Sequence, residues 1–381
     1  MRDGTALAGR WRRDPRGRVG HATCARAAEI TGSAPKHTEA VILPGVGASV
    51  PWMSPLRIGI LGAARIAEQA IVAPAKATGD RLVAVAARDP RRAEEYAARH
   101  GVERALGSYA EVLADPEVDV VYNPLANALH GPLNRAAIAA GKHVLSEKPF
   151  AANAAEAHEV RTAAEAASVT VVEAFHYVHH PLPLRLREVV RSGELGPIRR
   201  IETAFRMPAP PDTDPRWQFG LAGGALMDLG CYSLHAQRFL GNAPRVVAAR
   251  AGERAGHPGV DEWLEATLEH ADGVEGIAQC DMSAAGWQIT AYVVGERGQA
   301  LAHNFALPQR DDRLTVWTGD DVRTERLGTR STYTYQLEAL GAHLRGETPF
   351  PLDLDDAVAT AELIDAAYTA AGLPPRPRYD A

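Results

Sequence analysis

The amino-acid sequence predicts an α/β protein of two domains, a parallel sheet with helices first and an open, mostly antiparallel sheet second. Three observations predict this arrangement. The chain has 381 residues, more than one hydrophobic core usually serves. Strand and helix patterns alternate from Leu56 to Glu173, as they do in a parallel sheet with crossover helices. Beyond His176 the pattern changes to proline-rich loops and β-rich runs, so we expect a first domain over residues 53–175 and a second over 176–381.

Residues 1–52 differ from the rest of the chain in having neither helical nor strand periodicity. The pattern becomes regular directly after Met53. We therefore exclude this segment from the predicted fold. Two interpretations remain open for it, a disordered extension or an overlong start with Met53 as the first residue.

The elements of the first domain follow from apolar runs and the residues that interrupt them. The predicted strands cover residues 56–61, 82–87, 118–122, 142–145 and 169–173. A helix begins near Ile66, and another covers residues 130–140 and stops before Gly141. A third begins at Asn153, whose side chain can cap it, with Glu156 three residues later as a capping-box partner.

The second domain is predicted to hold few helices. One begins near Leu226, a strand covers residues 289–294, and an Ala-rich helix covers residues 354–371. On the helix from Leu226, spacings of four and seven place Asp228, Tyr232 and His235 on one face. A second stripe reads as core and consists of Leu226, Leu229, Ala236 and Leu240.

Composition excludes several functional classes. The 41 basic and 47 acidic residues give a net charge of -6, which offers nucleic acid no general attraction and favours a small-molecule partner. Cys24, Cys231 and Cys280 lack zinc or disulfide spacing, so we expect a reducing cytoplasm. No run of about 18 apolar residues predicts a membrane span. The adjacent pair His179 and His180 has no carboxylate or cysteine at ligand spacing, so we predict no metal site.

A small-residue turn follows the first predicted strand, in the sequence Gly62-Ala63-Ala64-Arg65-Ile66-Ala67. A dinucleotide fold needs small residues here for a tight turn, for approach of the backbone to pyrophosphate and for helix packing. This is a weakened Gly-x-Ala-x-x-Ala form, and an ordinary turn between strand and helix is the alternative. Its position after a strand and at a helix start favours an N-terminal Rossmann domain that binds a dinucleotide.

The end of the second strand bears on the choice of cofactor. An acidic side chain there would bind a ribose diol, whereas a basic one accommodates a 2′-phosphate. The sequence places Arg88 there and Arg92 one turn later, which favours NADP. Asp89 keeps NAD open as the alternative.

A Lys-Pro pair stands at the end of a predicted parallel strand, in Gly141-Lys142-His143-Val144-Leu145-Ser146-Glu147-Lys148-Pro149. Upstream lies Asn127-Ala128-Leu129-His130, and downstream lies Gly223-Gly224-Ala225-Leu226-Met227-Asp228-Leu229-Gly230-Cys231-Tyr232. In this order and spacing the blocks resemble the Gfo/Idh/MocA oxidoreductase family. The resemblance runs from Leu56 to the C-terminus. Within the family, the branch of dimeric dihydrodiol dehydrogenase, NADP-dependent xylose dehydrogenase and glucose-fructose oxidoreductase is most similar.

The resemblance implies roles for individual residues. Tyr232 would be the general acid and base, with Lys148 beside it to lower its pKa and orient the substrate hydroxyl. Asp228 and His235 would hold substrate hydroxyls, and Arg216 with Trp217 would line the substrate pocket. The implied cofactor-binding residues are Gly62, Ala64, Arg65, Ile66, Arg88, Arg92, Pro124, Asn127, His130, Glu147 and Lys148.

The chain departs from the family pattern after Glu173. His176 stands where relatives often carry methionine, and Val178 stands where they often carry arginine. These departures leave the substrate contacts at the mouth of the site unassigned.

The sequence thus predicts an NADP-preferring dehydrogenase or reductase acting on an aldose, a polyol or a cyclic diol. Two alternatives share the fold: an NAD-assisted glycosidase and a regulatory protein that binds the cofactor without turnover. Family resemblance implies a homodimer or homotetramer formed through the open face of the second sheet, since an uncovered face would expose a large apolar patch.

Overall fold

The computed structural model describes residues 55–379. The prediction for residues 1–52 and the position of Cys24 lie outside the described residues. Among the described residues, no helix has the length and apolar character needed to cross a membrane.

The first sheet has six strands in the order β3-β2-β1-β4-β5-β6, and all neighbouring strands are parallel. The strands are β1 (Arg57–Leu61), β2 (Arg81–Ala86), β3 (Arg104–Leu106), β4 (Val120–Asn123), β5 (His143–Ser146) and β6 (Val171–Glu173). Nearly all residues of β1, β2, β4 and β5 are buried, as expected of strands covered on both faces. This strand order is that of the dinucleotide-binding fold, and the predicted Rossmann architecture is confirmed.

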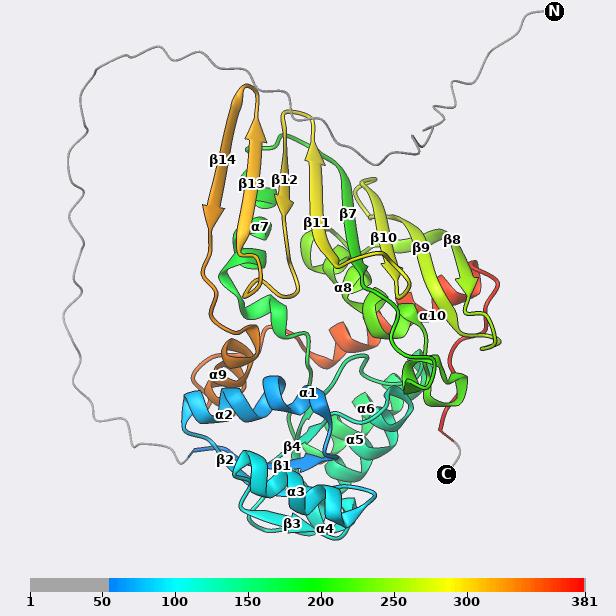
Figure 1. Ribbon diagram of the computed structural model, residues 1–381. Coiled ribbons are helices and arrows are strands. Elements are labelled where there is room, and N and C mark those ends of the chain that lie inside the picture. The colour runs from blue at the N-terminus through cyan, green and yellow to red at the C-terminus, as the bar shows by residue number, and fades with distance from the viewer. Residues whose placement is uncertain (1–54, 380–381) are drawn as a thin grey trace, which may run out of the picture. The chain divides into compact units, whose positions relative to one another are not determined.

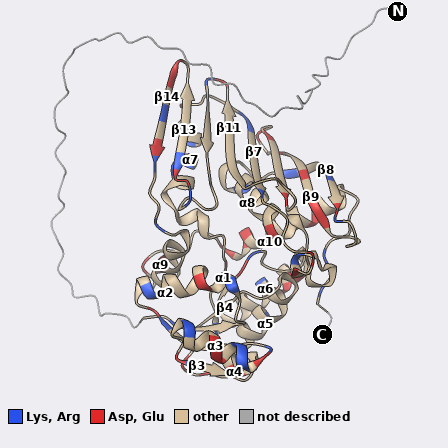
Figure 2. Ribbon diagram, in the orientation of Figure 1, with Lys and Arg blue, Asp and Glu red and all other residues tan. Residues whose placement is uncertain are grey.

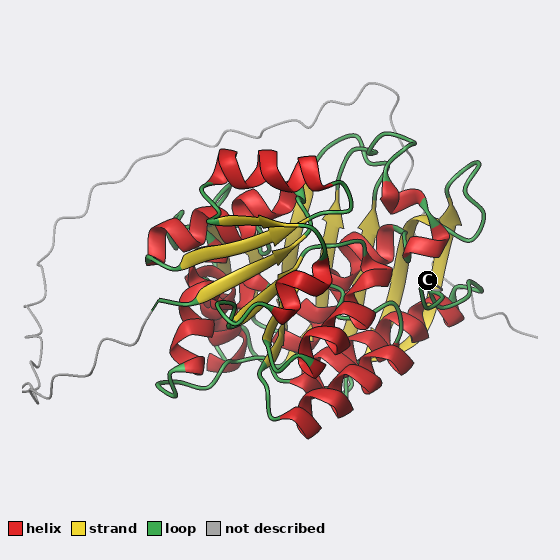
Figure 3. Ribbon diagram, turned by 90° about the horizontal axis from the view of Figure 1, so that it is seen from below, coloured by secondary structure: helices red, strands yellow, loops and turns green. Residues whose placement is uncertain are grey.

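Helices cover both faces of this sheet (Figure 3). They are α1 (Arg65–Ala67), η1 (Glu68–Val72), α2 (Ala73–Thr78), α3 (Pro90–His100), α4 (Tyr109–Ala114), η2 (Asn127–Leu129), α5 (His130–Ala139) and α6 (Ala154–Ala167). Asn153 caps α6 as predicted, accepting a hydrogen bond from the Glu156 backbone N–H at 3.0 Å. The Glu156 carboxylate, however, accepts from the Ala152 N–H at 2.9 Å, so the predicted capping box is displaced by one residue.

The second sheet has eight strands in the order β14-β13-β12-β11-β7-β10-β9-β8. They are β7 (Ile198–Arg206), β8 (Arg245–Glu253), β9 (Asp261–Glu269), β10 (Glu275–Asp281), β11 (Gln288–Gly295), β12 (Gly298–Ala302), β13 (Arg313–Thr318) and β14 (Asp321–Arg326). Only β7 and β10 pair in parallel, so the prediction of a large, mostly antiparallel sheet is confirmed.

The second part of the chain holds more helices than predicted. They are η3 (His176–His179), α7 (Pro181–Ser192), η4 (Pro215–Trp217), η5 (Phe219–Leu221), η6 (Leu226–Gly230), α8 (Cys231–Leu240), α9 (Thr332–Leu344) and α10 (Leu354–Ala370). Helices α7, α8 and α10 pack on one face of the eight-stranded sheet (Figure 1). Helices α9 and α10 also pack on α2 and α6 of the first domain.

The opposite face of this sheet is mixed in character, rather than the uniformly apolar patch that we expected. A row of hydrogen-bonded polar side chains crosses it from β7 to β8. Arg206 donates to Gln279 at 2.6 Å, Gln279 donates to Glu265 at 2.6 Å, and Arg250 donates to Glu265 at 3.0 Å. Figure 2 shows acidic positions on β9 beside basic positions on β8. The face also carries partly buried apolar side chains, among them Trp263, Tyr292, Leu301 and Trp317, so charge pairing and apolar surface share it.

Candidate functional site

Several of the predicted site residues meet at one edge of the parallel sheet. Gly62 follows β1, Pro124 follows β4, and Glu147 and Lys148 follow β5. Because neighbouring strands are parallel, their carboxyl ends lie together, and ligands of open α/β sheets bind at this edge.

The turn after β1 requires glycine. Gly62 has φ +100°, and a Cβ at this position would lie 2.7 Å from Cδ2 of Leu125. Ala64 precedes the helical segment that runs from Arg65 to Thr78, with Arg65 exposed and Ile66 partly buried. A tight, small-residue turn at a helix start fits the pyrophosphate of a dinucleotide.

Two basic side chains lie beside this turn. Arg88 is exposed after β2, and Nη2 of Arg92 donates a hydrogen bond to the Ala63 carbonyl at 3.2 Å. Asp89 caps α3, accepting from the Arg91 N–H at 3.1 Å, so its carboxylate is already used by the helix. This arrangement fits a 2′-phosphate better than a ribose diol.

Tyr109 joins the same group, although its sequence context gave no signal. Its hydroxyl lies 3.9 Å from the Cβ position of Gly62. Burial raises the pKa of Tyr109, while Arg88 and Arg92 oppose that rise, because both guanidinium groups lie near its hydroxyl.

The residues after β4 make hydrogen bonds to other loops of the protein. Pro124 is buried, and Nδ2 of Asn127 donates to the Ala222 carbonyl at 2.9 Å. His130 is buried, with its ring nitrogens 2.7 Å from the Pro149 carbonyl and 2.9 Å from the Leu125 carbonyl. His130 therefore holds the turns after β4 and β5 and presents no free ring nitrogen to a cofactor, contrary to its predicted role.

Glu147 also faces inward. Its carboxylate accepts a hydrogen bond from the Tyr122 hydroxyl at 2.8 Å, and burial raises its pKa. The side chain therefore fixes the strand end from which Lys148 projects.

Lys148, Asp214, Arg216 and Asp228 form an ionic cluster. Nζ of Lys148 donates to Oδ1 of Asp228 at 3.0 Å and to its backbone carbonyl at 2.8 Å. Nε of Arg216 donates to Oδ2 of Asp228 at 2.7 Å, and Nη1 of Arg216 lies 3.2 Å from Oδ2 of Asp214. Burial alone would raise the pKa of Asp228, but Lys148 and Arg216 outweigh it and hold that pKa below its usual range.

Tyr232 lies beside the cluster, but Lys148 does not reach its hydroxyl. Nζ of Lys148 is 5.2 Å from the centroid of the Tyr232 ring, while the hydroxyl is hydrogen-bonded to Nε2 of His176 at 2.9 Å. Burial raises the pKa of Tyr232 well above 10. The expected lowering of this pKa by Lys148 is absent, because the ammonium is paired with Asp228 and the ring is buried. Tyr232 is thus a protonated phenol, suited to giving a proton.

Of the three residues predicted to share one helix face, Asp228 and Tyr232 both lie beside Lys148, whereas His235 is bonded to Tyr177 and Asp356. The wide turn η6 contains Asp228 and changes its orientation relative to residues of α8. His235 is 1% exposed, with Nδ1 2.7 Å from the Tyr177 hydroxyl and Nε2 2.9 Å from the Asp356 carboxylate. Both ring nitrogens are engaged inside the protein, so His235 is not free to hold a substrate hydroxyl.

Trp217 also lies away from the pocket that we expected it to line. It is 1% exposed, and Nε1 donates to the Pro210 carbonyl at 3.3 Å. The Arg254 guanidinium packs over its ring at 4.9 Å. Trp217 is therefore a core residue, whereas its neighbour Arg216 reaches the ionic cluster.

An aromatic wall beside Tyr232 was not predicted. The Phe205 ring lies 5.4 Å from Tyr232 and 6.4 Å from Trp287, which is 56% exposed. Tyr333 from α9 packs on His176 at 3.9 Å. Sequence spacing gives no signal for these contacts, because strands and helices far apart in the chain make them.

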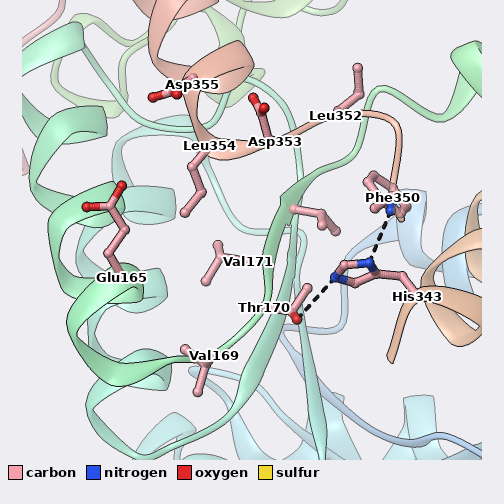
Figure 4. Close-up of a pocket in the computed structure, with 11 residues that line it drawn as sticks. Glu165, Val169, Thr170, Val171, His343, Phe350, Leu352, Asp353, Leu354 and Asp355 are labelled. Atoms are coloured by element: carbon pink, nitrogen blue, oxygen red, sulfur yellow. Dashed lines mark hydrogen bonds between the residues drawn. The ribbon is translucent and has the colours of Figure 1, made fainter. Parts of the chain in front are cut away.

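A cavity of about 380 Å³ lies elsewhere, at the amino end of β6 (Figure 4). It is lined by Val169, Thr170 and His343, among others, and Nδ1 of His343 accepts from the Phe350 N–H at 3.1 Å. None of the predicted site residues lines it. Because ligands of parallel sheets bind at the carboxyl ends, we place the functional site at Lys148 and Tyr232.

Comparison with protein families gives two matches within the chain. Residues 56–175 match the model described as an oxidoreductase family with an NAD-binding Rossmann fold. Residues 184–301 match the model of the GFO/IDH/MocA C-terminal domain.

Individual relatives agree with these matches. A D-xylose 1-dehydrogenase (NADP(+)) of Haloferax volcanii is 37% identical over 323 residues, 83% of this chain and 97% of the relative. A trans-1,2-dihydrobenzene-1,2-diol dehydrogenase of Mus musculus is 36% identical over 66% of this chain and 76% of the relative. The crystal structure of a 3-ketoreductase from Actinomadura kijaniata with NADP and TDP-benzene has a TM-score of 0.78 and 28% identity, covering 83% of this chain and 98% of that one.

Proposed function

The chain belongs to the Gfo/Idh/MocA family of oxidoreductases, and we propose that it interconverts a hydroxyl and a carbonyl of an aldose, polyol or cyclic diol, with NADP as preferred cofactor. The observation that carries this proposal is the meeting of a protonated Tyr232 with the Lys148 and Asp228 ion pair, at the sheet edge that carries the Gly62 turn. The relatives named above are sugar and diol dehydrogenases and a ketoreductase, which supports the same substrate class.

The cofactor fits the turn after β1. Gly62 leaves the space that a side chain would fill, and Arg88, Arg92 and Tyr109 would hold the 2′-phosphate. When bound, NADP supplies the carbon that gives or takes the hydride.

Tyr232 would transfer the proton. In the direction of reduction, its hydroxyl gives a proton to the substrate oxygen as that oxygen gains negative charge. Lys148 is a fixed cation next to this position and is held in place by Asp228, so it would stabilise the developing charge where little water is present. In the direction of oxidation, Tyr232 would first lose its own proton, and its phenolate would then take the hydroxyl proton, with Lys148 as the fixed cation beside it.

The balance of charge in the ionic cluster favours a neutral substrate. Lys148 and Arg216 are matched by Asp214 and Asp228, so these four groups leave no excess positive charge for a carboxylate or a phosphate. The exposed ring of Trp287 offers an apolar surface to the carbon face of a sugar or diol.

The experiment is an assay of purified protein with NADP and then with NAD, against a panel of aldoses, polyols and dihydrodiols. We expect NADPH formation on one substrate class. Arg92→Gln should raise the KM for NADP about tenfold and leave that for NAD unchanged, because one hydrogen bond to a charged group is lost. Cofactor binding without turnover on any substrate would support the regulatory alternative. Hydrolysis without net NADPH formation would support the glycosidase.

Location and assembly are part of the proposal. The free thiols of Cys231 and Cys280 are consistent with a reducing cytoplasm. A homodimer or homotetramer would use the uncovered face of the eight-stranded sheet, where a partner must meet the polar row from Arg206 to Arg250. Light scattering of the wild type and of Gln279→Ala tests this interface by giving the molar mass of each. A wholly monomeric wild type would contradict the proposed assembly.

A further inference from the structure

His176 is the residue in direct contact with the reacting oxygen of Tyr232. The Nε2 atom lies 2.9 Å from the Tyr232 hydroxyl, and the ring is 1% exposed. The ring is held in place by Tyr333, whose centroid is 3.9 Å away. Such a buried, fixed contact restricts Tyr232 to one orientation.

The second ring nitrogen of His176 shows where its proton lies. Nδ1 is buried and has no hydrogen-bond partner among the described residues. A buried N–H without an acceptor is rare, so the neutral ring is best satisfied with its proton on Nε2. In that tautomer the ring donates to the Tyr232 oxygen and leaves the Tyr232 O–H free to point at a substrate.

Lys148 cannot fill this place in the structure. Its Nζ donates to the Asp228 carboxylate and backbone carbonyl, and it faces the ring of Tyr232 rather than the hydroxyl. The donor directly at the oxygen is therefore His176.

Resting on the proposed function, we propose that His176 is a positioning residue whose Nε2–H donates to the Tyr232 oxygen and stabilises the phenolate formed when Tyr232 gives up its proton. In reduction, bound NADPH would supply the hydride to the carbonyl carbon and be left as NADP. The substrate oxygen, which then carries the carbonyl π electrons, takes the proton as the Tyr232 O–H bond breaks. Water returns a proton to the phenolate before the next turnover. Oxidation follows the same steps in reverse.

The charged and titratable groups around this pair are few. Tyr333 faces both rings from α9, His179 lies on the same turn as His176, and Lys148 approaches from the end of β5. Around Tyr232 there are also Glu147, Asp228, Cys231 and Tyr177, whose ring centroid lies 6.1 Å from that of Tyr232. Burial lowers the pKa of His176 well below 6.5, with Lys148 and His179 adding to the effect, so the ring acts as a neutral donor.

Two variants separate this role from simple packing. Met fills a similar space to His176 but has no donor, whereas the amide nitrogen of Gln can reach the position of Nε2. We expect His176→Met to lower kcat about tenfold to a hundredfold with KM unchanged, and His176→Gln to recover most of that loss. In the direction of oxidation, the pKa of the rate profile should rise by about one to two units in the Met variant only. Unchanged kcat and pH profile in the Met variant, or equal losses in both variants, would overturn the proposal.

A second measurement does not depend on turnover. The tyrosinate absorbance of Tyr232, obtained as the difference from Tyr232→Phe in the full chain, should appear at lower pH in the wild type and His176→Gln than in His176→Met. Equal titration in all three would contradict the role of His176. If the wild type turns over no substrate of the panel, the proposed function fails, and this titration still decides the pairing of His176 with Tyr232.

Discussion

Two ion pairs hold the segment from Gly223 to Tyr232, and they differ in whether a substrate can reach their charges. The side chains of Lys148 and Asp228 are 13% and 15% exposed, so a substrate at the sheet edge can meet them. The side chains of Arg376 and Asp261 are both 0% exposed. Both are pairs of a basic and an acidic side chain, but Lys148 with Asp228 is accessible to a substrate, whereas Arg376 with Asp261 is sealed from solvent.

The sealed pair holds the start of the segment. Asp261 accepts hydrogen bonds from the Leu226 N–H and the Tyr368 hydroxyl, and Arg376 donates to the Gly223 carbonyl. A Cβ on Gly224, which has φ +130°, would lie 2.0 Å from Oδ1 of Asp261. This glycine of the sequence block thus makes room for the sealed pair, while Asp228 and Tyr232 further along face the site. The first residues of the block from Gly223 to Tyr232 thus serve the fold, and the later ones serve the site.

The largest expected effect concerns the sealed pair. Arg376→Met should lower the free energy of unfolding by about 3–5 kcal/mol, because Asp261 would remain buried without its cation. Urea unfolding measures this loss. Arg378→Met is the matched control, since Arg378 pairs with Glu159 at an exposed position and should change stability by less than about 1 kcal/mol. Equal losses in the two variants would remove the distinction between sealed and accessible pairs.

The accessible pair should affect the reaction more than the fold. Lys148→Met should lower kcat about a hundredfold, because the substrate oxygen loses its fixed cation. Asp228 keeps Arg216 as a partner, so the loss of stability should be smaller than that of Arg376→Met. Steady-state kinetics and urea unfolding of the same samples check both expectations, with the exposed Lys76→Met as control. A variant that unfolds readily but keeps its kcat would contradict the assignment.

The smallest effect is the response of the accessible pair to acid. The pKa of Asp228 is lower in the folded protein than in the unfolded chain, so its contribution to stability is present above about pH 4 and is lost as the pH falls further. The stability difference between wild type and Asp228→Asn should then shrink by at most about 1.4 kcal/mol per pH unit. The free energies of unfolding of wild type and Asp228→Asn, measured at a series of pH values below about 4, should approach each other as the pH falls. A difference in the free energy of unfolding that stays the same at every pH would show that the neighbours do not lower the pKa of Asp228.

The sequence predicted the parallel sheet well because its signals are local. Apolar runs such as β2 are buried on both faces, and Gly62 takes the backbone conformation that the turn needs. Lys148, Arg216, Asp228 and Tyr232 come together as the motifs implied. The resemblance of these sequence blocks to a family implied that the four groups would lie together.

What the sequence did not predict depends on distant contacts. The turn η6 widens the helix that carries Asp228, which regular helical spacing does not show. Asp356 binds His235 from α10, and Tyr333 reaches His176 from α9. The contacts of His235 and His176 depend on residues that meet only after folding.

The most direct test of the account is the rate of NADPH formation by wild type and Tyr232→Phe on the substrate class found in the panel, together with NADP binding by both. Removal of the hydroxyl takes away the proton donor and leaves the ring in its packing. We predict that kcat falls about 10²- to 10⁴-fold while the affinity for NADP is unchanged. A Tyr232→Phe variant as active as the wild type would contradict the central claim that this phenol carries the substrate proton.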